Sequence, residues 1–180
     1  MTSAILIVGA TGGIGSALAR RLSAGGASLF LAGRDESRLA ALGAEIGASY
    51  AVVDATDFSD MDRIGDRAHA ELGRIDGMVN CAGSLLLKPA HLTKSDEFHA
   101  TIATNLTTAF AVVRTAARLM TDGGAVVLCS SAAARVGLAN HEAIAAAKAG
   151  VLGLMLSAAA TYATRGLRVK AVAPGLVRRR

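Results

Sequence analysis

The sequence predicts an α/β fold in which helices cover both faces of one doubly wound parallel sheet, as a three-layer αβα sandwich. Short apolar runs rich in Val, Ile and Leu alternate with longer segments of helical period, the pattern of repeated βαβ units. The 180 residues suit a single domain, residues 1–180, and no linker or repeat divides them. Hydrophobic residues make up 52% of the chain and aromatic residues 3%, so we expect Ala, Val, Leu and Ile to fill the core.

The expected strands are short and nearly continuous in hydrophobicity, as strands buried on both faces of a sheet should be. The expected helices are segments in which apolar residues recur three and four positions apart. Glycines follow most of these segments, where helix C-termini favour them. The expected strands are residues 4–9, 28–33, 50–53, 77–81, 125–129 and 168–172, and the expected helices are about residues 14–24, 36–46, 59–72, 95–120 and 141–164.

A glycine-rich turn, Gly9-Ala10-Thr11-Gly12-Gly13-Ile14-Gly15, joins the first expected strand to the first expected helix. Glycines let the backbone turn sharply and approach a pyrophosphate, while the start of a helix offers free N–H groups and a partial positive charge. At the beginning of a βαβ unit this pattern predicts a dinucleotide site. The alternative is a turn with a structural role only.

The second expected strand ends in Gly33-Arg34, where NAD-binding domains place a carboxylate on the ribose hydroxyls. A guanidinium at this point pairs with the 2′-phosphate of NADP, and no carboxylate occupies the strand end to repel it. The sequence therefore favours NADP(H) over NAD(H). The alternative is a solvated Arg34 that opens the next helix beside Asp35 and Glu36.

The spacing of Gly9, Gly13 and Gly15 resembles the TGxxxGxG pattern of the short-chain dehydrogenase/reductase superfamily, with Val8 in place of the leading Thr. Further matches follow in the family's order and cover essentially the whole chain. They are Asp54 in VVDATD, Asn80-Cys81-Ala82-Gly83 for NNAG, Asn105 in TNL, Ser131 in LCSSAAA, Lys148 in AAAKAG, and Pro174-Gly175 after the last strand. The resemblance implies a Rossmann-type sheet with strand order 3-2-1-4-5-6 and an oxidoreductase activity.

The resemblance also implies roles for individual residues. Asp54 would meet the adenine ring, Lys148 the nicotinamide ribose, and Pro174 and Gly175 the nicotinamide. Ser131 would orient a substrate carbonyl, and Asn105 would anchor a proton-relay water. The implied cofactor-binding residues are Gly9, Thr11, Gly12, Gly13, Ile14, Gly15, Arg34, Asp54, Ala55, Asn80, Ala82, Gly83, Lys148, Pro174 and Gly175.

One departure from the family's pattern bears on catalysis. The family places a proton-transferring Tyr four residues before the Lys, and that position is Ile144 here. A positioned acid or base typically contributes about 10²- to 10⁴-fold, so its loss would leave hydride transfer slow. We hypothesise that His141 acts as a surrogate acid; the alternative is a polar residue at the start of a helix.

A second departure is length. Members of the family usually continue past the Pro-Gly pair with a helical lid and a seventh strand, and the family's Thr five residues after the Pro is Arg179 here. We expect either a truncated product or a pocket completed by another chain. Because the sixth strand would leave an open sheet edge, we also expect a homodimer or homotetramer, paired through helices 95–120 and 141–164.

Composition argues against several other classes. The longest uncharged stretches, such as residues 149–164, are shorter than the roughly 20 residues of a membrane span, and no signal peptide precedes the first strand. We therefore expect a cytoplasmic protein without a membrane partner. The net charge of +5 is scattered and stacking aromatics are scarce, which argues against nucleic acid. Cys81 and Cys129 fit no metal spacing and are expected to be buried free thiols.

Two functions remain after these exclusions. The first is an NADP(H)-dependent oxidoreductase that acts on a small carbonyl or alcohol, indicated by the glycine turn, Ser131, Lys148 and Asn105. The second is a catalytically inactive dinucleotide-binding protein that serves as a sensor or interaction partner, indicated by Ile144 and the absent lid.

Overall fold

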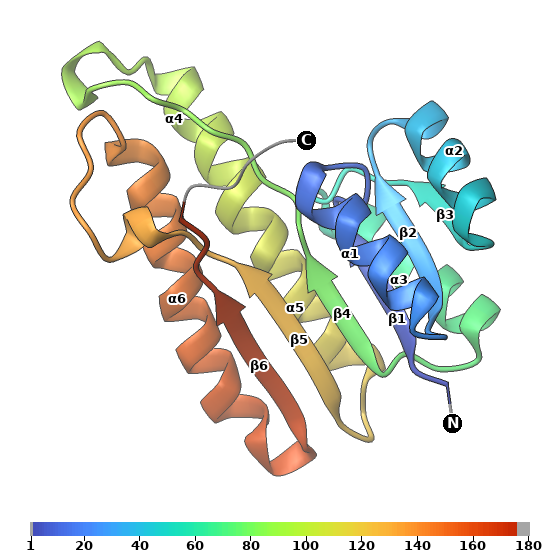
Figure 1. The fold of residues 1–180 in the computed structure, drawn as a ribbon. Helices are drawn as coiled ribbons and strands as arrows, with labels where there is room; N and C mark the ends of the chain where they lie inside the picture. The colour runs from blue at the N-terminus through green and yellow to red at the C-terminus, as the bar shows by residue number, and fades with distance from the viewer. Residues whose placement is uncertain (1, 176–180) are drawn as a thin grey trace.

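Six parallel strands form one sheet in the order β3-β2-β1-β4-β5-β6 in the computed structural model, which describes residues 2–175. The predicted fold class and strand order are confirmed (Figure 1). Every expected strand is found, with ends that differ by about one residue. The strands are β1 Ala4–Val8, β2 Ser28–Gly33, β3 Ser49–Val52, β4 Gly77–Asn80, β5 Gly124–Cys129 and β6 Leu167–Val172.

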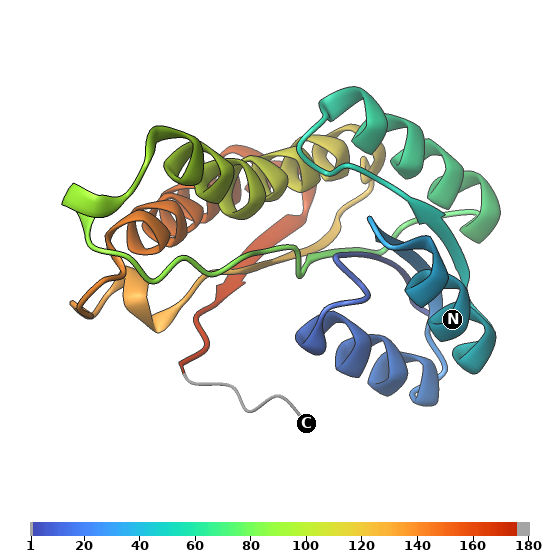
Figure 2. The same cartoon turned by 90° about the horizontal axis from the view of Figure 1, so that it is seen from above.

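Helices cover both faces of this sheet, as predicted. Figure 2 shows α1 and α2 on one face and α3, α5 and α6 on the other. Short 3-10 turns, Ala90–Leu92, Ala132–Ala134 and Ala163–Arg165, lie in the connections. The helices are α1 Gly13–Ala24, α2 Glu36–Ile46, α3 Phe58–Leu72, α4 Ser95–Ile102, α5 Thr108–Leu119 and α6 Glu142–Tyr162.

The core consists of two apolar clusters, one on each face of the sheet. Alternation along β1 divides them, because Leu6 and Val8 face α3 and α5 while Ile7 faces α1 and α2. Phe30 is the one fully buried aromatic ring among the described residues, and small aliphatic side chains fill the rest, as the composition predicted. The carboxyl ends of the strands are thereby held in one row, where a ligand of an open α/β sheet binds.

The expected helix over residues 95–120 is found, but its middle is π-helical. A π-helical segment, Ala103–Thr107, separates α4 from α5 and carries the buried Asn105. The side chain of Asn105 donates to the carbonyl oxygen of Thr101 at 3.0 Å, and the Thr108 hydroxyl donates to the carbonyl oxygen of Thr104 at 2.8 Å. Such side chains compete for the carbonyls of the preceding turn, which is a known cause of helix distortion.

The expectation that no segment is long and apolar enough to span a membrane is wrong for α6. The helix and its last turn, Glu142–Arg165, comprise 24 residues, and an 18-residue window within them has a mean hydropathy of 1.7, enough by length and composition to cross a bilayer. The core helix of a globular protein has the same properties. Ala147 and Val151 are fully buried on the side of α6 that packs on β5 and β6, while Leu156 is exposed, so packing on the sheet accounts for part of its apolar character.

Helices α3 and α5 pack closely at Gly65. A Cβ atom on this residue would lie 2.5 Å from Cγ2 of Thr115 and 2.9 Å from Cδ1 of Leu119. Arg114 of α5 also pairs with Asp62 of α3 at 2.7 Å, beside the same contact. The absence of a side chain at residue 65 therefore sets the distance between the two helices.

We predict that Gly65→Ala lowers the free energy of unfolding by about 1–3 kcal/mol through overpacking, although Ala favours an isolated helix by about 1 kcal/mol. Urea denaturation measures the change. Thr115→Ser removes the methyl group that is nearest to the added Cβ, so the double variant should lose less than the sum of the single variants. A Gly65→Ala protein at least as stable as the parent would contradict this packing.

Candidate functional site

The turn between β1 and α1 lies directly against the end of β4. Gly9 has φ +76°, and a Cβ atom on it would lie 2.4 Å from the main-chain nitrogen of Ala82. A Cβ on Gly15 would lie 2.3 Å from the carbonyl oxygen of Gly9. The N–H groups of Gly9 and Ala10 both donate to the carbonyl oxygen of Ala32, at 2.8 and 3.0 Å. Only glycine therefore fits at Gly9 and Gly15. The turn follows β1, is hydrogen-bonded to the end of β2 and contacts the end of β4.

The first turn of α1 offers its amide groups to a ligand. Helix α1 begins at Gly13, and its N-cap residue, Gly12, contributes no side-chain hydrogen bond. Ser16 closes the first helical bond to Gly12 at 2.9 Å, so the intervening residues Gly13, Ile14 and Gly15 present the free N–H groups of a helix N-terminus. A cradle without side chains at the positive end of a helix fits a diphosphate.

Two arginines lie where the sequence predicted one. Arg34 follows β2 and is exposed, and Arg38, in the first turns of α2, donates to the carbonyl oxygen of Thr11 at 2.5 Å. Arg38 was not predicted, although its spacing of four from Arg34 at the start of a helix was visible in the sequence. The two guanidinium groups make this end of the glycine turn positively charged.

Asp54 follows β3 beside these arginines. Its carboxylate accepts hydrogen bonds from the N–H of Thr56 at 3.0 Å and from the Thr56 hydroxyl at 2.7 Å. These bonds lower the pKa of Asp54, and the positive charge of Arg34 lowers it further. Asp54 is exposed and Ala55 is buried, so the residue predicted for the adenine ring is an ionised, accessible acceptor.

The segment after β4 is fastened to α5 by Asn80. This side chain is 1% exposed. Its oxygen accepts from the N–H of Ala82 at 3.1 Å, and its amide nitrogen donates to the Thr108 hydroxyl at 3.2 Å. Thr108 was not predicted. Asn80 therefore holds the main chain of Ala82 in the position that Gly9 contacts.

Asn105 fastens the same segment one turn further along. Its side-chain oxygen accepts from the N–H of Ser84 at 3.2 Å, and its amide nitrogen donates to the Ser84 hydroxyl at 3.0 Å. A Cβ on Gly83 would lie 3.0 Å from Oδ1 of Asn105 and 3.5 Å from Nζ of Lys148. The structure thus brings Asn105, Gly83 and Lys148 together, as the sequence predicted for residues of one site.

Lys148 extends from α6 to the end of β5. It is 7% exposed, and its ammonium group donates to the carbonyl oxygen of Cys129 at 2.8 Å. Burial lowers the pKa of Lys148, because the charged form loses its water. One hydrogen bond satisfies one of three ammonium hydrogens, and the others have no partner among the described residues. The buried Ser130 hydroxyl donates to the carbonyl oxygen of Lys148 at 2.8 Å and fixes the backbone of α6.

Ser131 lies beside this lysine at the end of β5. Its Oγ accepts from the N–H of Ala133 at 3.2 Å, which leaves the hydroxyl proton free to donate within the described structure. The carbonyl oxygen of Pro174 accepts from the N–H of Ala132 at 2.9 Å, so the Pro174-Gly175 pair lies at the same turn. Arg179, which takes the place of the family's Thr, lies outside the described residues.

A buried aliphatic residue occupies the position where the family's pattern places a proton-transferring Tyr. Ile144 lies on α6 one turn before Lys148 and is 3% exposed. His141 immediately precedes α6, and its Nδ1 donates to the carbonyl oxygen of Ala139 at 2.7 Å. The imidazole is partly exposed and keeps Nε2 for another partner.

Cys81 and Cys129 are free, as predicted, but they are partly exposed rather than buried, and they lie against each other. A hydrogen bond from the Cys81 thiol, assisted by the ammonium group of Lys148, lowers the pKa of Cys129 to about 7. The same contact and burial raise the pKa of Cys81 above its ordinary value. The contact was not predicted, although the expected strands 77–81 and 125–129 are neighbours in the predicted order and end at these two cysteines.

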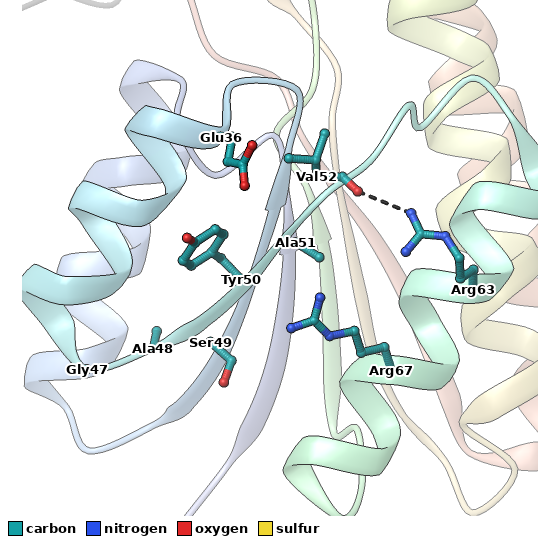
Figure 3. Close-up of a pocket in the computed structure, with 9 residues that line it drawn as sticks. All are labelled: Glu36, Gly47, Ala48, Ser49, Tyr50, Ala51, Val52, Arg63 and Arg67. Carbon is teal, nitrogen blue, oxygen red and sulfur yellow. Dashed lines mark hydrogen bonds between the residues drawn. The ribbon is translucent and has the colours of Figure 1, made fainter.

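A separate hollow of about 940 Å³ follows the edge strand β3 (Figure 3). Glu36, Tyr50, Arg63 and Arg67 line it, and Arg63 donates to the carbonyl oxygen of Val52 at 3.3 Å. Charged side chains over an edge strand protect its unpaired backbone groups from other strands. The hollow lies at the sheet's edge, outside β2, and contains none of the residues predicted for the site.

Three comparisons with known proteins agree. The profile of the family described as short chain dehydrogenase matches residues 3–179. D-threitol dehydrogenase of Mycolicibacterium smegmatis is 34% identical over 179 residues, covering 96% of this chain and 69% of the relative. Cis-4-hydroxycyclohexanecarboxylate dehydrogenase of Sinomonas cyclohexanicum is 38% identical over 177 residues, covering 94% and 71%. A short-chain type dehydrogenase/reductase structure from Mycobacterium ulcerans has a TM-score of 0.94 at 30% identity, covering 99% and 70%.

We predict a pH-dependent cost of burying Lys148. The pKa of Lys148 in the folded protein lies below 10.5, its value in the unfolded chain. Between these two pH values the unfolded chain keeps the ammonium proton while the folded protein releases it. The free-energy cost of burying the charge therefore disappears as pH rises toward 10.5. The melting temperature of the parent minus that of Lys148→Met should therefore increase from neutral pH to about pH 10.5. Lys148→Met also removes a positive charge that lowers the pKa of Cys129. This second effect changes the difference in melting temperature in the same direction.

Lys170→Met is the matched control, because Lys170 is exposed on β6. Thermal unfolding under reducing conditions measures all three proteins. A difference for Lys148→Met that stays flat or falls with pH would contradict the buried charge.

Proposed function

The chain belongs to the short-chain dehydrogenase family, and from this premise we propose that it is an NADP(H)-dependent oxidoreductase acting on a small alcohol or carbonyl compound. The cradle of Gly9 and Gly15 is the observation that carries the proposal. A side chain on either residue would collide with backbone atoms, while the α1 amides at the same place have no capping side chain. This combination serves close approach by an anionic ligand.

The residues around the cradle fit the remaining parts of a pyridine dinucleotide. Asp54 is an acceptor for an adenine amino group, Lys148 has ammonium hydrogens available for ribose hydroxyls, and we assign Pro174 and Gly175, at the turn after Ser131, to the nicotinamide. The nicotinamide ring supplies or accepts the hydride when the cofactor is bound. Gly83 keeps this space open, because a Cβ there would come within 3.5 Å of Nζ of Lys148.

Preference for the phosphorylated cofactor is proposed from Arg34 and Arg38. Their roles differ, because Arg38 is already hydrogen-bonded to the main chain of Thr11 while Arg34 has no hydrogen bond within the described structure. We assign selectivity for the 2′-phosphate to Arg34 and support of the glycine turn to Arg38. A charge-assisted pair with a phosphate is worth about 1.5–3 kcal/mol.

Ser131 and Lys148 supply the polar groups for the substrate. The free hydroxyl proton of Ser131 can donate to a carbonyl oxygen, and the buried ammonium of Lys148 stabilises negative charge nearby. Asn105 acts through structure, by holding the chain at Ser84 and Gly83. Ile144 contributes no proton, so we keep His141 as the candidate acid and expect slow turnover.

The surface next to Ser131 suits a substrate with apolar parts. Leu85 and Leu87 after β4, and Val136 and Leu138 after β5, are exposed. The two loops are joined, because the N–H of Lys88 donates to the carbonyl oxygen of Asn140 at 2.8 Å. Relatives that act on D-threitol and on cis-4-hydroxycyclohexanecarboxylate support a small secondary alcohol as the substrate class.

A second function, dinucleotide binding without turnover, is favoured by one observation. Ile144 is an aliphatic residue, 3% exposed, at the position where the family's proton donor is expected. If His141 performs that role, His141→Gln should abolish the remaining turnover. If turnover is unchanged in His141→Gln, the imidazole has no part in the mechanism.

We also propose that the protein assembles as a homodimer or homotetramer through α5 and α6. Phe110 on α5 and Leu156 on α6 are 48% and 65% exposed, which leaves apolar surface on both helices for a partner. Light scattering that shows a monomer at micromolar concentration would rule this assembly out.

We predict that Arg34→Gln weakens NADPH binding by about 10- to 100-fold and leaves NADH binding nearly unchanged, because only the phosphorylated ribose loses a charged partner. Nucleotide fluorescence titrations measure both affinities. Arg67→Gln, on α3 beside the β3 hollow, is the matched control and should change neither. Equal losses for the two nucleotides would contradict the assignment of Arg34.

We predict that Ile144→Tyr raises the rate of alcohol oxidation by about 10²- to 10⁴-fold by restoring a positioned proton acceptor. The assay follows NADPH formation from NADP⁺ with D-threitol and cis-4-hydroxycyclohexanecarboxylate. Ile144→Phe has nearly the same added volume without the hydroxyl group, so it should show no gain. An equal change in both variants would mean that volume, and not proton transfer, is responsible.

A further inference from the structure

Cys81 and Cys129 lie side by side at the carboxyl end of the sheet. Asn80 and Leu128 are register partners in the pairing of β4 with β5, and the two cysteines are the next residues of these strands. Cys81 remains bonded to β1 at 2.8 Å through Val8. Neighbouring strands lie about 4.8 Å apart. A disulfide joins Cα atoms about 4.4–6.8 Å apart, so a bond between these thiols requires only local adjustment.

We assign Cys129 as the nucleophile of the pair, because the ammonium group of Lys148 lies at its carbonyl oxygen. The Cys81 thiol donates a hydrogen bond to the Cys129 sulfur, and Lys148, whose ammonium contacts the Cys129 carbonyl oxygen at 2.8 Å, adds its charge. Both effects favour the thiolate, and they oppose the effect of burial. Cys81 and Lys148 are the titratable groups of the described structure that act on Cys129. Both cysteines are partly exposed, which leaves access for a small oxidant.

We propose that Cys81 and Cys129 form a peroxide-sensitive pair that closes reversibly to a disulfide and thereby weakens dinucleotide binding. The Cys129 thiolate attacks one oxygen of hydrogen peroxide, the O–O bond breaks, and the products are a sulfenic acid and hydroxide, which takes a proton to become water. The Cys81 sulfur then attacks the Cys129 sulfur and loses its proton. The S–S bond forms as the S–O bond breaks, and a second water leaves. Two thiols are oxidised while one peroxide is reduced to two waters.

Formation of the disulfide would affect two parts of the proposed cofactor site, the glycine turn and Lys148. The carbonyl carbon of Cys81 lies 2.7 Å from the Cβ position of Gly9, so a movement of Cys81 bears directly on the glycine turn. Cys129 carries the carbonyl oxygen that holds the ammonium group of Lys148. The effect on nucleotide binding rests on the proposed function, whereas the thiol chemistry does not.

The chemistry is tested on reduced protein without nucleotide. The protein is treated with hydrogen peroxide, then alkylated, and its intact mass is measured. We expect loss of both alkylatable thiols without added oxygen, at a rate independent of protein concentration, and full recovery with dithiothreitol. Retention of both thiols, addition of oxygen to either cysteine, or disulfide-linked dimers would each overturn the pair.

Single variants separate the two roles. Cys81→Ser should accumulate a Cys129 sulfenic acid, captured by dimedone, because no thiol remains to resolve it. Cys129→Ser should react more slowly, because burial still raises the pKa of Cys81 in this variant and the ammonium group of Lys148 lies at the main chain of residue 129. Faster oxidation of Cys129→Ser than of Cys81→Ser would reverse the assignment of the nucleophile.

The regulatory effect is measured by titrating NADPH into reduced and peroxide-treated protein. We expect severalfold weaker binding after oxidation, reversal by dithiothreitol, and no change in a peroxide-treated Cys81→Ser/Cys129→Ser double variant. Equal affinity of the reduced and oxidised forms would overturn regulation even if the disulfide forms. Reduced protein that binds no NADPH would instead refute the proposed function, and the mass measurement would still decide the thiol chemistry.

Discussion

The close contact between Gly9 and the peptide that joins Cys81 to Ala82 is the constraint on which the rest of the site depends. With a backbone nitrogen 2.4 Å from the Cβ position of Gly9, β1, β4 and the start of α1 meet without any intervening side chain. Gly15, six residues later, is in similarly close contact, because a Cβ atom there would lie 2.3 Å from the carbonyl oxygen of Gly9. The central strands can therefore end at the same level, and the α1 amides point to the space above them. A cradle for an anion follows from packing alone.

A second set of buried polar groups extends this order to the catalytic half of the sheet. Asn80 and Asn105, each 1% exposed, bind the segment after β4 to the α4–α5 helical region, and the π-helical turn places Asn105 for this purpose. Lys148 and Ser130 bind α6 to the end of β5. Within the described residues, no buried side-chain nitrogen or oxygen lacks a hydrogen-bond partner. Such hydrogen-bonded networks are rigid, which suits a site that positions a ligand.

Much of this was predictable from the chain because it depends on local pattern. The alternation of apolar runs and helical segments predicted the sheet, and the glycine turn predicted a sharp junction between the first strand and the first helix, which the structure has. Arg38, Thr108 and the cysteine contact were not predicted, because each depends on which segments the fold brings together. The π-helical turn was missed for a related reason: the apolar period continues through it, while the distortion comes from side-chain bonds to Thr101 and Thr104.

The central claim is that the amides between β1 and α1 receive the diphosphate of a dinucleotide. Two-dimensional ¹H–¹⁵N NMR during titration with NADPH tests it most directly, because each amide reports for itself. The account predicts the largest shifts at Gly13, Ile14 and Gly15, whose N–H groups are free, with saturation at one nucleotide per chain. Unchanged resonances at these three residues, or shifts confined to the β3 edge, would contradict it.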